Sequence, residues 1–138
     1  MLERFMICDN GLENRYRNNF ITGYRIKIGI PYYRSIPLSC IEEITLMVDS
    51  KEVDPNSITL ELGGAEHSLS ELSSRIDIWW GFQEKGYLVV KNEGGINQGK
   101  HEIKIHFIIR VPYLIPTNGD FLPNYDVTNA VKLLEVNA

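Results

Sequence analysis

The stretch that decides the fold is Ile103-Lys104-Ile105-His106-Phe107-Ile108-Ile109-Arg110-Val111, in which at least every second residue is apolar. Successive side chains of a β-strand point to opposite faces of a sheet, so this alternation predicts a strand with one buried face. The same period of two recurs in shorter runs along the chain: Tyr24 to Ile30, Ile44 to Val48, Ile58 to Leu62, Ile76 to Phe82 and Leu88 to Val90, and more weakly Val131 with Leu133.

Turn-forming residues separate these runs, among them Asp54-Pro55-Asn56, Gly63-Gly64 and Glu84-Lys85-Gly86. Six or more strands with turns about every eight to twelve residues predict an all-β fold, an antiparallel β-sandwich formed by residues 1–138 as a single domain. Ser68 and Glu71 have the spacing of a capping box and predict one helical turn. The predicted core is Ile26, Ile28, Leu46, Val48, Leu60, Ile78, Trp80, Val90, Ile105, Phe107 and Ile109.

The composition limits the classes of partner. The chain has 138 residues, of which 43% are apolar and 23% charged, and its net charge is -4. An acidic chain has no cationic surplus for phosphate backbones or anionic membrane surfaces, so we expect neither nucleic acid nor a membrane as partner. Two cysteines, Cys8 and Cys40, are too few for a disulfide framework. The start Met1–Phe5 has an acid where a signal peptide would be basic, and no apolar h-region follows it. We therefore expect a cytoplasmic protein.

Two predicted strands end in similar phrases, Ile30-Pro31-Tyr32 and Val111-Pro112-Tyr113. Proline lacks an N–H donor and ends the strand ladder, so each phrase predicts a strand exit into a stiff loop. Two interpretations stay open: rings that cap the core edge, or an apolar patch of the composition found in interface hot spots. For the second, the predicted partner-interface residues are Tyr32, Tyr33, Arg34, Ile36, Tyr113 and Leu114.

Residues with catalytic or metal-binding chemistry are dispersed. His101 and His106 are five apart, which places them on opposite faces of a strand, and His67 lies in another segment. We therefore predict no metal site and no catalytic residue in this chain. Trp79 shares a predicted face with Asp77, and a ring beside an acid is found in sugar-binding sandwiches. Trp79 is thus a candidate ligand-proximal residue, although packing explains tryptophan pairs more often.

Several stretches of the chain resemble one family. Met6–Asn14, Gly23–Ile28, Ile30–Ser39 and Gly99–Ile103 together resemble the small, beta subunit of bacterial C-glycoside deglycosidases. The resemblance spans about Met6 to Tyr113, and its most specific part is Ile30–Ser39, which combines prolines, two tyrosines and an arginine.

The resemblance implies a β-sandwich that acts as the non-catalytic subunit of a carbon–carbon lyase. In that family an alpha subunit, similar to sugar isomerase or epimerase barrels, holds a divalent metal, often manganese, and supplies the catalytic groups. The hetero-oligomer cleaves the C–C bond between a 3-oxo sugar and a flavonoid or related aglycone. The beta subunit itself is expected to hold no cofactor and to meet the C-glycoside only through the complex.

Two other classes compete with this interpretation. A stand-alone carbohydrate-binding β-sandwich module would use Trp79, Tyr32, Tyr33 and Arg34 to stack on and hydrogen-bond a sugar. A cupin-like barrel enzyme would need a histidine-rich metal site, which the histidine spacing opposes.

Overall fold

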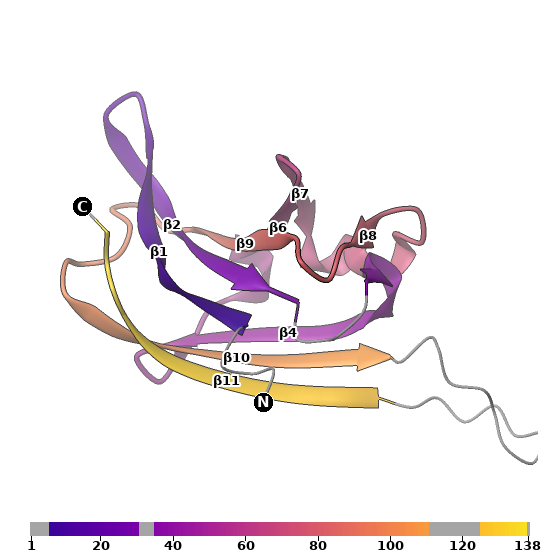
Figure 1. Ribbon diagram of the computed structural model, residues 1–138. Coiled ribbons are helices and arrows are strands. Elements are labelled where there is room, and N and C mark those ends of the chain that lie inside the picture. Colours follow the sequence, from indigo (N-terminus) through magenta and orange to yellow (C-terminus); the bar gives the residue numbers. More distant parts are fainter. Residues whose placement is uncertain (1–5, 31–34, 111–124, 138) are drawn as a thin grey trace, which may run out of the picture.

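The chain folds into two antiparallel sheets that face each other across an apolar core (Figure 1). The computed structural model describes residues 6–30, 35–110 and 125–137, without the side chain of Asp126. The five-stranded sheet has the order β1 (Ile7–Arg17), β2 (Phe20–Gly29), β9 (Lys85–Lys91), β6 (Ile58–Leu62), β7 (Ala65–Ser68). The four-stranded sheet has the order β11 (Tyr125–Glu135), β10 (Lys100–Arg110), β4 (Ile41–Val48), β5 (Lys51–Glu52). The predicted antiparallel β-sandwich is confirmed.

Short elements connect the longer strands. β3 (Ile36–Pro37) and β8 (Trp79–Trp80) form a separate two-stranded pair. The 3-10 helices among the described residues are η1 (Leu38–Cys40), η2 (Pro55–Ser57) and η3 (Leu69–Ser74). The predicted helical turn is η3, and its capping box is present: the Ser68 backbone N–H donates to Glu71 Oε1 at 2.8 Å.

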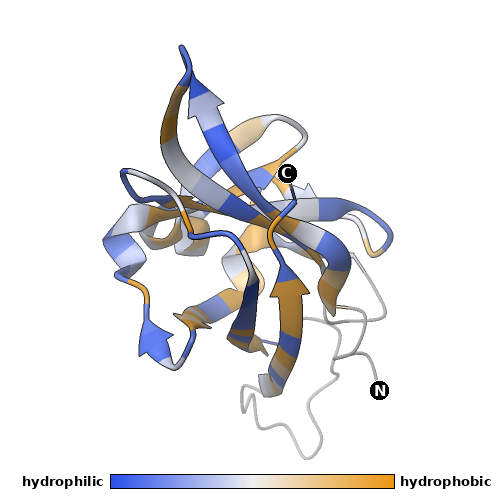
Figure 2. Cartoon of the chain, turned by 90° about the vertical axis from the view of Figure 1, so that its left-hand side faces the viewer, coloured by the Kyte–Doolittle hydropathy of each residue, from blue (hydrophilic) through white to orange (hydrophobic). Residues whose placement is uncertain are grey.

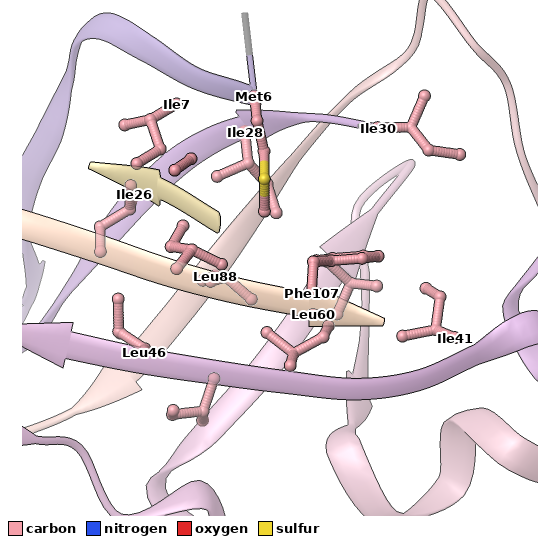
Figure 3. Close-up of a cluster of buried hydrophobic side chains, with 14 of the residues drawn as sticks. Met6, Ile7, Ile26, Ile28, Ile30, Ile41, Leu46, Leu60, Leu88 and Phe107 are labelled. Carbon is pink, nitrogen blue, oxygen red and sulfur yellow. The ribbon is translucent and has the colours of Figure 1, made fainter. Parts of the chain in front are cut away.

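The core lies between the inward faces of the two sheets (Figure 3). From β10, alternate residues Ile103, Ile105, Phe107 and Ile109 point inward and are at most 1% exposed. Most of the predicted core is confirmed, while two members, Val48 and Ile78, are only partly buried. The confirmed residues are Ile26, Ile28, Leu46, Leu60, Trp80, Val90, Ile105, Phe107 and Ile109.

The predicted strand from Ile76 to Phe82 is wrong beyond its two tryptophans. Ile76 is 74% exposed and Phe82 is 54% exposed, so the alternation there does not mark a core face. Trp80 pairs with Ile36 of the short strand β3, and the chain turns directly afterwards, where the Glu84 N–H donates to Gly81 O at 2.9 Å. Pairing with two residues of β3 therefore limits the strand to Trp79–Trp80.

The predicted orientation of the last strand is also wrong. Alternation assigns Val131 and Leu133 to a buried face, but they are 57% and 62% exposed. Their neighbours Ala130 and Leu134 are buried, because the register with β10 places Ala130 opposite the inward-facing Ile105. Between Ala130 and Leu134 both parities carry apolar residues, so alternation there could not decide which face is buried.

Candidate partner interface

The two adjacent tryptophans of β8 point to opposite sides. Trp80 is fully buried, contacts Phe107 edge to face with ring centroids 6.2 Å apart, and donates from Nε1 to Glu84 O at 2.7 Å. Trp79 is 53% exposed. Because side chains alternate along a strand, burying Trp80 in the core directs Trp79 outward.

Three exposed apolar side chains, Ile76, Trp79 and Phe82, form what we call the tryptophan rim. Backbone hydrogen bonds fix its segment to the chain that follows residue 34: the Leu38 N–H donates to Ile78 O at 2.9 Å. Ser35 Oγ accepts a hydrogen bond from the Phe82 N–H at 3.1 Å. The rim is therefore anchored to the residue next to the predicted interface segment.

The structure describes only part of the predicted interface. Tyr32, Tyr33, Arg34, Tyr113 and Leu114 lie outside the described residues, so their role stays a prediction. Ile36 is fully buried against the core. In this structure Ile36 is a core residue rather than an exposed contact, because its pairing with Trp80 turns its side chain inward.

The strands that lead to the two proline-tyrosine phrases run in the same direction. Figure 1 shows β2 and β10 pointing in the same direction, toward the end that bears β8, although β10 extends further. The tryptophan rim therefore lies at the end toward which both strands run. Trp79, predicted to lie near a ligand, is exposed there, and a ligand contact by Trp79 remains a prediction.

The charged groups beside the rim are engaged with one another. Arg75 donates from Nε to Glu71 Oε2 at 3.1 Å and lies 3.9 Å from Asp77 Oδ2. The hydrogen bond from the Ser68 backbone N–H, followed by the one from Arg75, lowers the pKa of Glu71. An anionic Glu71 held by a cap and an arginine is a structural carboxylate and a poor general base.

The three histidines occupy separate sites. His67 is buried, 3.8 Å from Glu71 Oε2, whereas His106 contacts Asn129 and Glu43 on the outer face of the four-stranded sheet. His101 lies on the inward side of the same strand, so the predicted opposite placement of His101 and His106 is confirmed. Within residues 6–30, 35–110 and 125–137, no three His, Cys, Asp or Glu side chains gather closely enough to share a metal ion.

His101 links two connections of the sandwich. Its Nδ1 lies 2.6 Å from Asp49 Oδ2, and its Nε2 lies 2.7 Å from Asn97 O. Burial opposes the charged imidazole, but the hydrogen bonds to Asp49 and Asn97 outweigh that effect and raise the pKa of His101. The hydrogen bond to His101 is also the main reason why the pKa of Asp49 is lowered. The pair stabilises a turn rather than forming a catalytic dyad.

Two further groups of exposed apolar side chains were not predicted from the sequence. The hairpin of β1 and β2 carries Tyr16 and Phe20, which are 65% and 75% exposed. β11 carries Val127, Val131 and Leu133 on its outer side, together with Tyr125 at its start. The signal for β11 was its run of apolar residues at both parities, which is typical of strands covered on both faces.

Taken together, the fold and surface define a class of protein: an antiparallel β-sandwich whose outer surface carries several apolar groups suited to protein contacts. In the described parts of the chain, no helix has the length and apolar character needed to cross a membrane. The family model for the C-glycoside deglycosidase beta subunit matches residues 2–113. The chain belongs to the C-glycoside deglycosidase beta subunit family.

Individual relatives agree with the family match. A C-glycoside deglycosidase beta subunit from Eubacterium cellulosolvens is 33% identical over 122 residues, which cover 88% of this chain and 83% of the relative. The beta subunit of a 3'-dehydrocarminate deglycosidase from Microbacterium sp is 32% identical over 94 residues, covering 67% and 70%. A C-glycoside deglycosidase beta subunit from Microbacterium trichothecenolyticum is 29% identical over 100 residues, covering 70% and 73%.

Proposed function

We propose that this chain is the beta subunit of a heteromeric C-glycoside deglycosidase, bound to an alpha subunit that carries the catalytic groups. The observation that carries the proposal is the family match over residues 2–113, a range that extends from before β1 to beyond β10 and so includes strands of both sheets. The proposed complex is a cytoplasmic carbon–carbon lyase. Its substrates are C-glycosides of flavonoids or related aglycones with the sugar oxidised at the 3-position.

The division of labour follows from the chemistry. Cleaving an aryl C-glycoside beside a 3-oxo group requires removal of a proton next to the carbonyl and protonation of the departing aryl carbon. Both steps need titratable groups that converge on the substrate. In the described residues the histidines are apart, and Glu71 and Asp49 are held in structural hydrogen bonds. We therefore assign proton transfer to the alpha subunit.

The proposed alpha subunit is a barrel of the sugar isomerase or epimerase type with a divalent metal, manganese. The described residues of this chain provide no fitting ligand group, so no step is assigned to a metal here. What the beta subunit supplies is a surface: the tryptophan rim is suited to hold loops of the alpha subunit and to exclude water.

The test is to produce the chain with and without the alpha subunit encoded in the same genome. Native mass spectrometry is expected to show a complex of the two chains, and metal analysis of the separated subunits is expected to find the divalent ion with the alpha subunit. A beta subunit that retains one divalent ion per chain after dialysis would contradict this division. So would an alpha subunit that forms no complex with the chain.

One observation favours a second candidate, the stand-alone carbohydrate-binding module. Trp79 exposes about half of its surface close to Arg75 and Asp77, which are joined at 3.9 Å. An aromatic face beside such polar groups can stack on a sugar ring. Calorimetric titration of the isolated chain with glucose, cellobiose and a flavonoid C-glucoside separates the two: a module binds at least one of them, whereas a subunit alone binds none.

A further inference from the structure

The two outer faces of the sandwich differ in chemistry. On the five-stranded sheet, Arg25 of β2 pairs with Glu13 of β1 and lies 3.8 Å from Glu61 Oε2 of β6. The guanidinium of Arg25 also stands 4.1 Å from the centre of the Tyr87 ring. This network across neighbouring strands is typical of a sheet face that meets water.

The outer face of the four-stranded sheet is apolar along its edge strand. We define the β11 outer face by its four exposed apolar side chains, Tyr125, Val127, Val131 and Leu133, which are 48%, 52%, 57% and 62% exposed. By alternation they share one side of the strand with the polar residues Asn129 and Glu135. In Figure 2, β11 is the strand that ends near the label C, and it carries orange bands along much of its length. The opposite side of β11 is buried in the core, through Thr128, Ala130 and Leu134.

An antiparallel sheet with one face in water normally carries polar side chains on that face, and the exposed apolar residues of β11 depart from this pattern. β11 is also the edge of its sheet, and natural edge strands usually expose charged side chains to prevent unwanted pairing. β1 contacts the C-terminal half of β11, where Lys132 Nζ lies 2.9 Å from Asp9 Oδ1. Lys132 lies on the inward-facing side of β11, so this ion pair does not cover Val131 and Leu133, which stay exposed.

The neighbours of this face give it a defined polarity. Across the β10 register, Val131 lies opposite Lys104 and Leu133 lies opposite Glu102, while Val127 lies opposite Ile108. A surface that covers β11 must therefore be apolar over the valines and leucine and carry an acid and a base near Lys104 and Glu102.

We propose that the β11 outer face docks the alpha subunit of the deglycosidase. The inference rests on the proposed function, which requires a second, different chain. It is also supported by position, because β11 begins at the end of the sandwich that bears β8 and the tryptophan rim (Figure 1).

The size of this face agrees with such a role. The 11 residues of β11 span about 36 Å at ~3.3 Å per residue. Together with its neighbour β10, at a strand spacing of ~4.8 Å, β11 presents an outer strip of about 350 Å². A stable heteromeric interface buries about 800 Å² per partner, so the strip supplies close to half of it. The tryptophan rim lies at the end where β11 begins and can supply part of the remainder.

The test uses the full chain and the alpha subunit from the same genome. The variant V131E/L133K places an acid opposite Lys104 and a base opposite Glu102, so it keeps the net charge and suits its cross-strand neighbours. The matched control, Y16E/F20K, makes the same exchange at exposed apolar positions of the β1–β2 hairpin. Circular dichroism and thermal melting check that both variants remain folded, and biolayer interferometry measures the dissociation constant.

We expect V131E/L133K to melt like the unmodified chain and to bind the alpha subunit at least 100-fold more weakly, while Y16E/F20K binds within threefold of the unmodified chain. Binding of V131E/L133K within threefold would overturn the docking assignment and leave the proposed function intact. Failure of the unmodified chain itself to bind would overturn the proposed function. If analytical ultracentrifugation shows that the chain alone is a dimer that V131E/L133K dissociates, with alpha binding unchanged, the occupant is a second copy and the proposal is wrong.

Discussion

Separate substitutions of the adjacent residues Trp79 and Trp80 distinguish packing in the core from a role at the surface. We predict that Trp80→Ala destabilises the fold far more than Trp79→Ala, although the two changes remove the same side chain. Trp80 is fully buried, contacts Phe107 and donates a hydrogen bond to Glu84 O, whereas Trp79 is 53% exposed.

The magnitudes follow from burial. Truncating a buried Trp or Phe to Ala costs about 3–5 kcal/mol, and the loss of the edge contact and hydrogen bond places Trp80→Ala at about 5 kcal/mol. A ring that buries about half of ~200 Å² gains about 2.5 kcal/mol at ~25 cal/mol per Å², and compactness of the unfolded chain reduces that to about 2 kcal/mol for Trp79→Ala. The predicted difference is therefore about 3 kcal/mol.

Urea unfolding monitored by circular dichroism measures both values, provided that the m-values of the variants agree. The same variants are tested for alpha-subunit binding, with Trp80→Phe as a folded control for the buried position. Trp79→Ala is expected to weaken binding about tenfold or more, and Trp80→Phe is expected to bind normally. Equal losses of stability for the two alanine variants would refute the assignment of Trp80 to the core and Trp79 to the rim.

Three further changes test other parts of the structure. Gly23→Ala should lower the free energy of unfolding by about 1–3 kcal/mol in urea denaturation, because a Cβ there would overlap the carbonyl oxygen of Val90 on the paired strand. His101→Gln should lower the free energy of unfolding most below pH ~6.5, because the protonated ring of His101 donates to both Asp49 and Asn97. The effect of the substitution should decrease as the pH rises through the raised pKa of His101, and melting temperatures across pH 5–9 measure it. Tyr33→Ala should weaken alpha-subunit association by about 2 kcal/mol or more in a titration, while the isolated chain melts normally.

For each of these three substitutions, a control variant or an outcome that would contradict the prediction can be stated. A Cβ at Gly81 meets its nearest atom at 3.5 Å, so Gly81→Ala should be close to neutral and isolates the steric effect at Gly23. A His101→Gln effect that grows as pH rises would contradict the linkage. Reduced thermal stability of Tyr33→Ala with unchanged binding would show that this ring caps the core rather than forming the interface.

The sequence was sufficient to predict the long strands and most of the core, because alternation is unambiguous where one parity is apolar and the other polar. β10 is the best example: Lys104, His106 and Arg110 mark its outer face, and the inward residues follow as predicted. Turn chemistry was equally informative at Gly63-Gly64, which joins β6 to β7 with positive φ angles of 58° and 86°.

The errors arose where tertiary pairing decides what local pattern cannot. In β11, apolar residues at both parities leave the buried face undetermined, and the register with β10 selects Ala130 and Leu134. Around β8, pairing with the two residues of β3 outweighs an alternation that extends to Ile76 and Phe82. The apolar surface groups could not be predicted because an apolar residue in a sequence is assigned to the core by default.

Reconstitution of activity is the decisive measurement for the non-catalytic role of this chain. Release of the aglycone from a 3-oxo-C-glucoside is measured with the alpha subunit alone, with this chain alone, and with the two mixed at increasing ratios. We predict no turnover by this chain alone and a rate that rises and saturates as the chain is added to a fixed amount of alpha subunit. Turnover by this chain alone, or an alpha-subunit rate that does not change on its addition, would contradict the claim that the chain is the non-catalytic subunit of a C-glycoside deglycosidase.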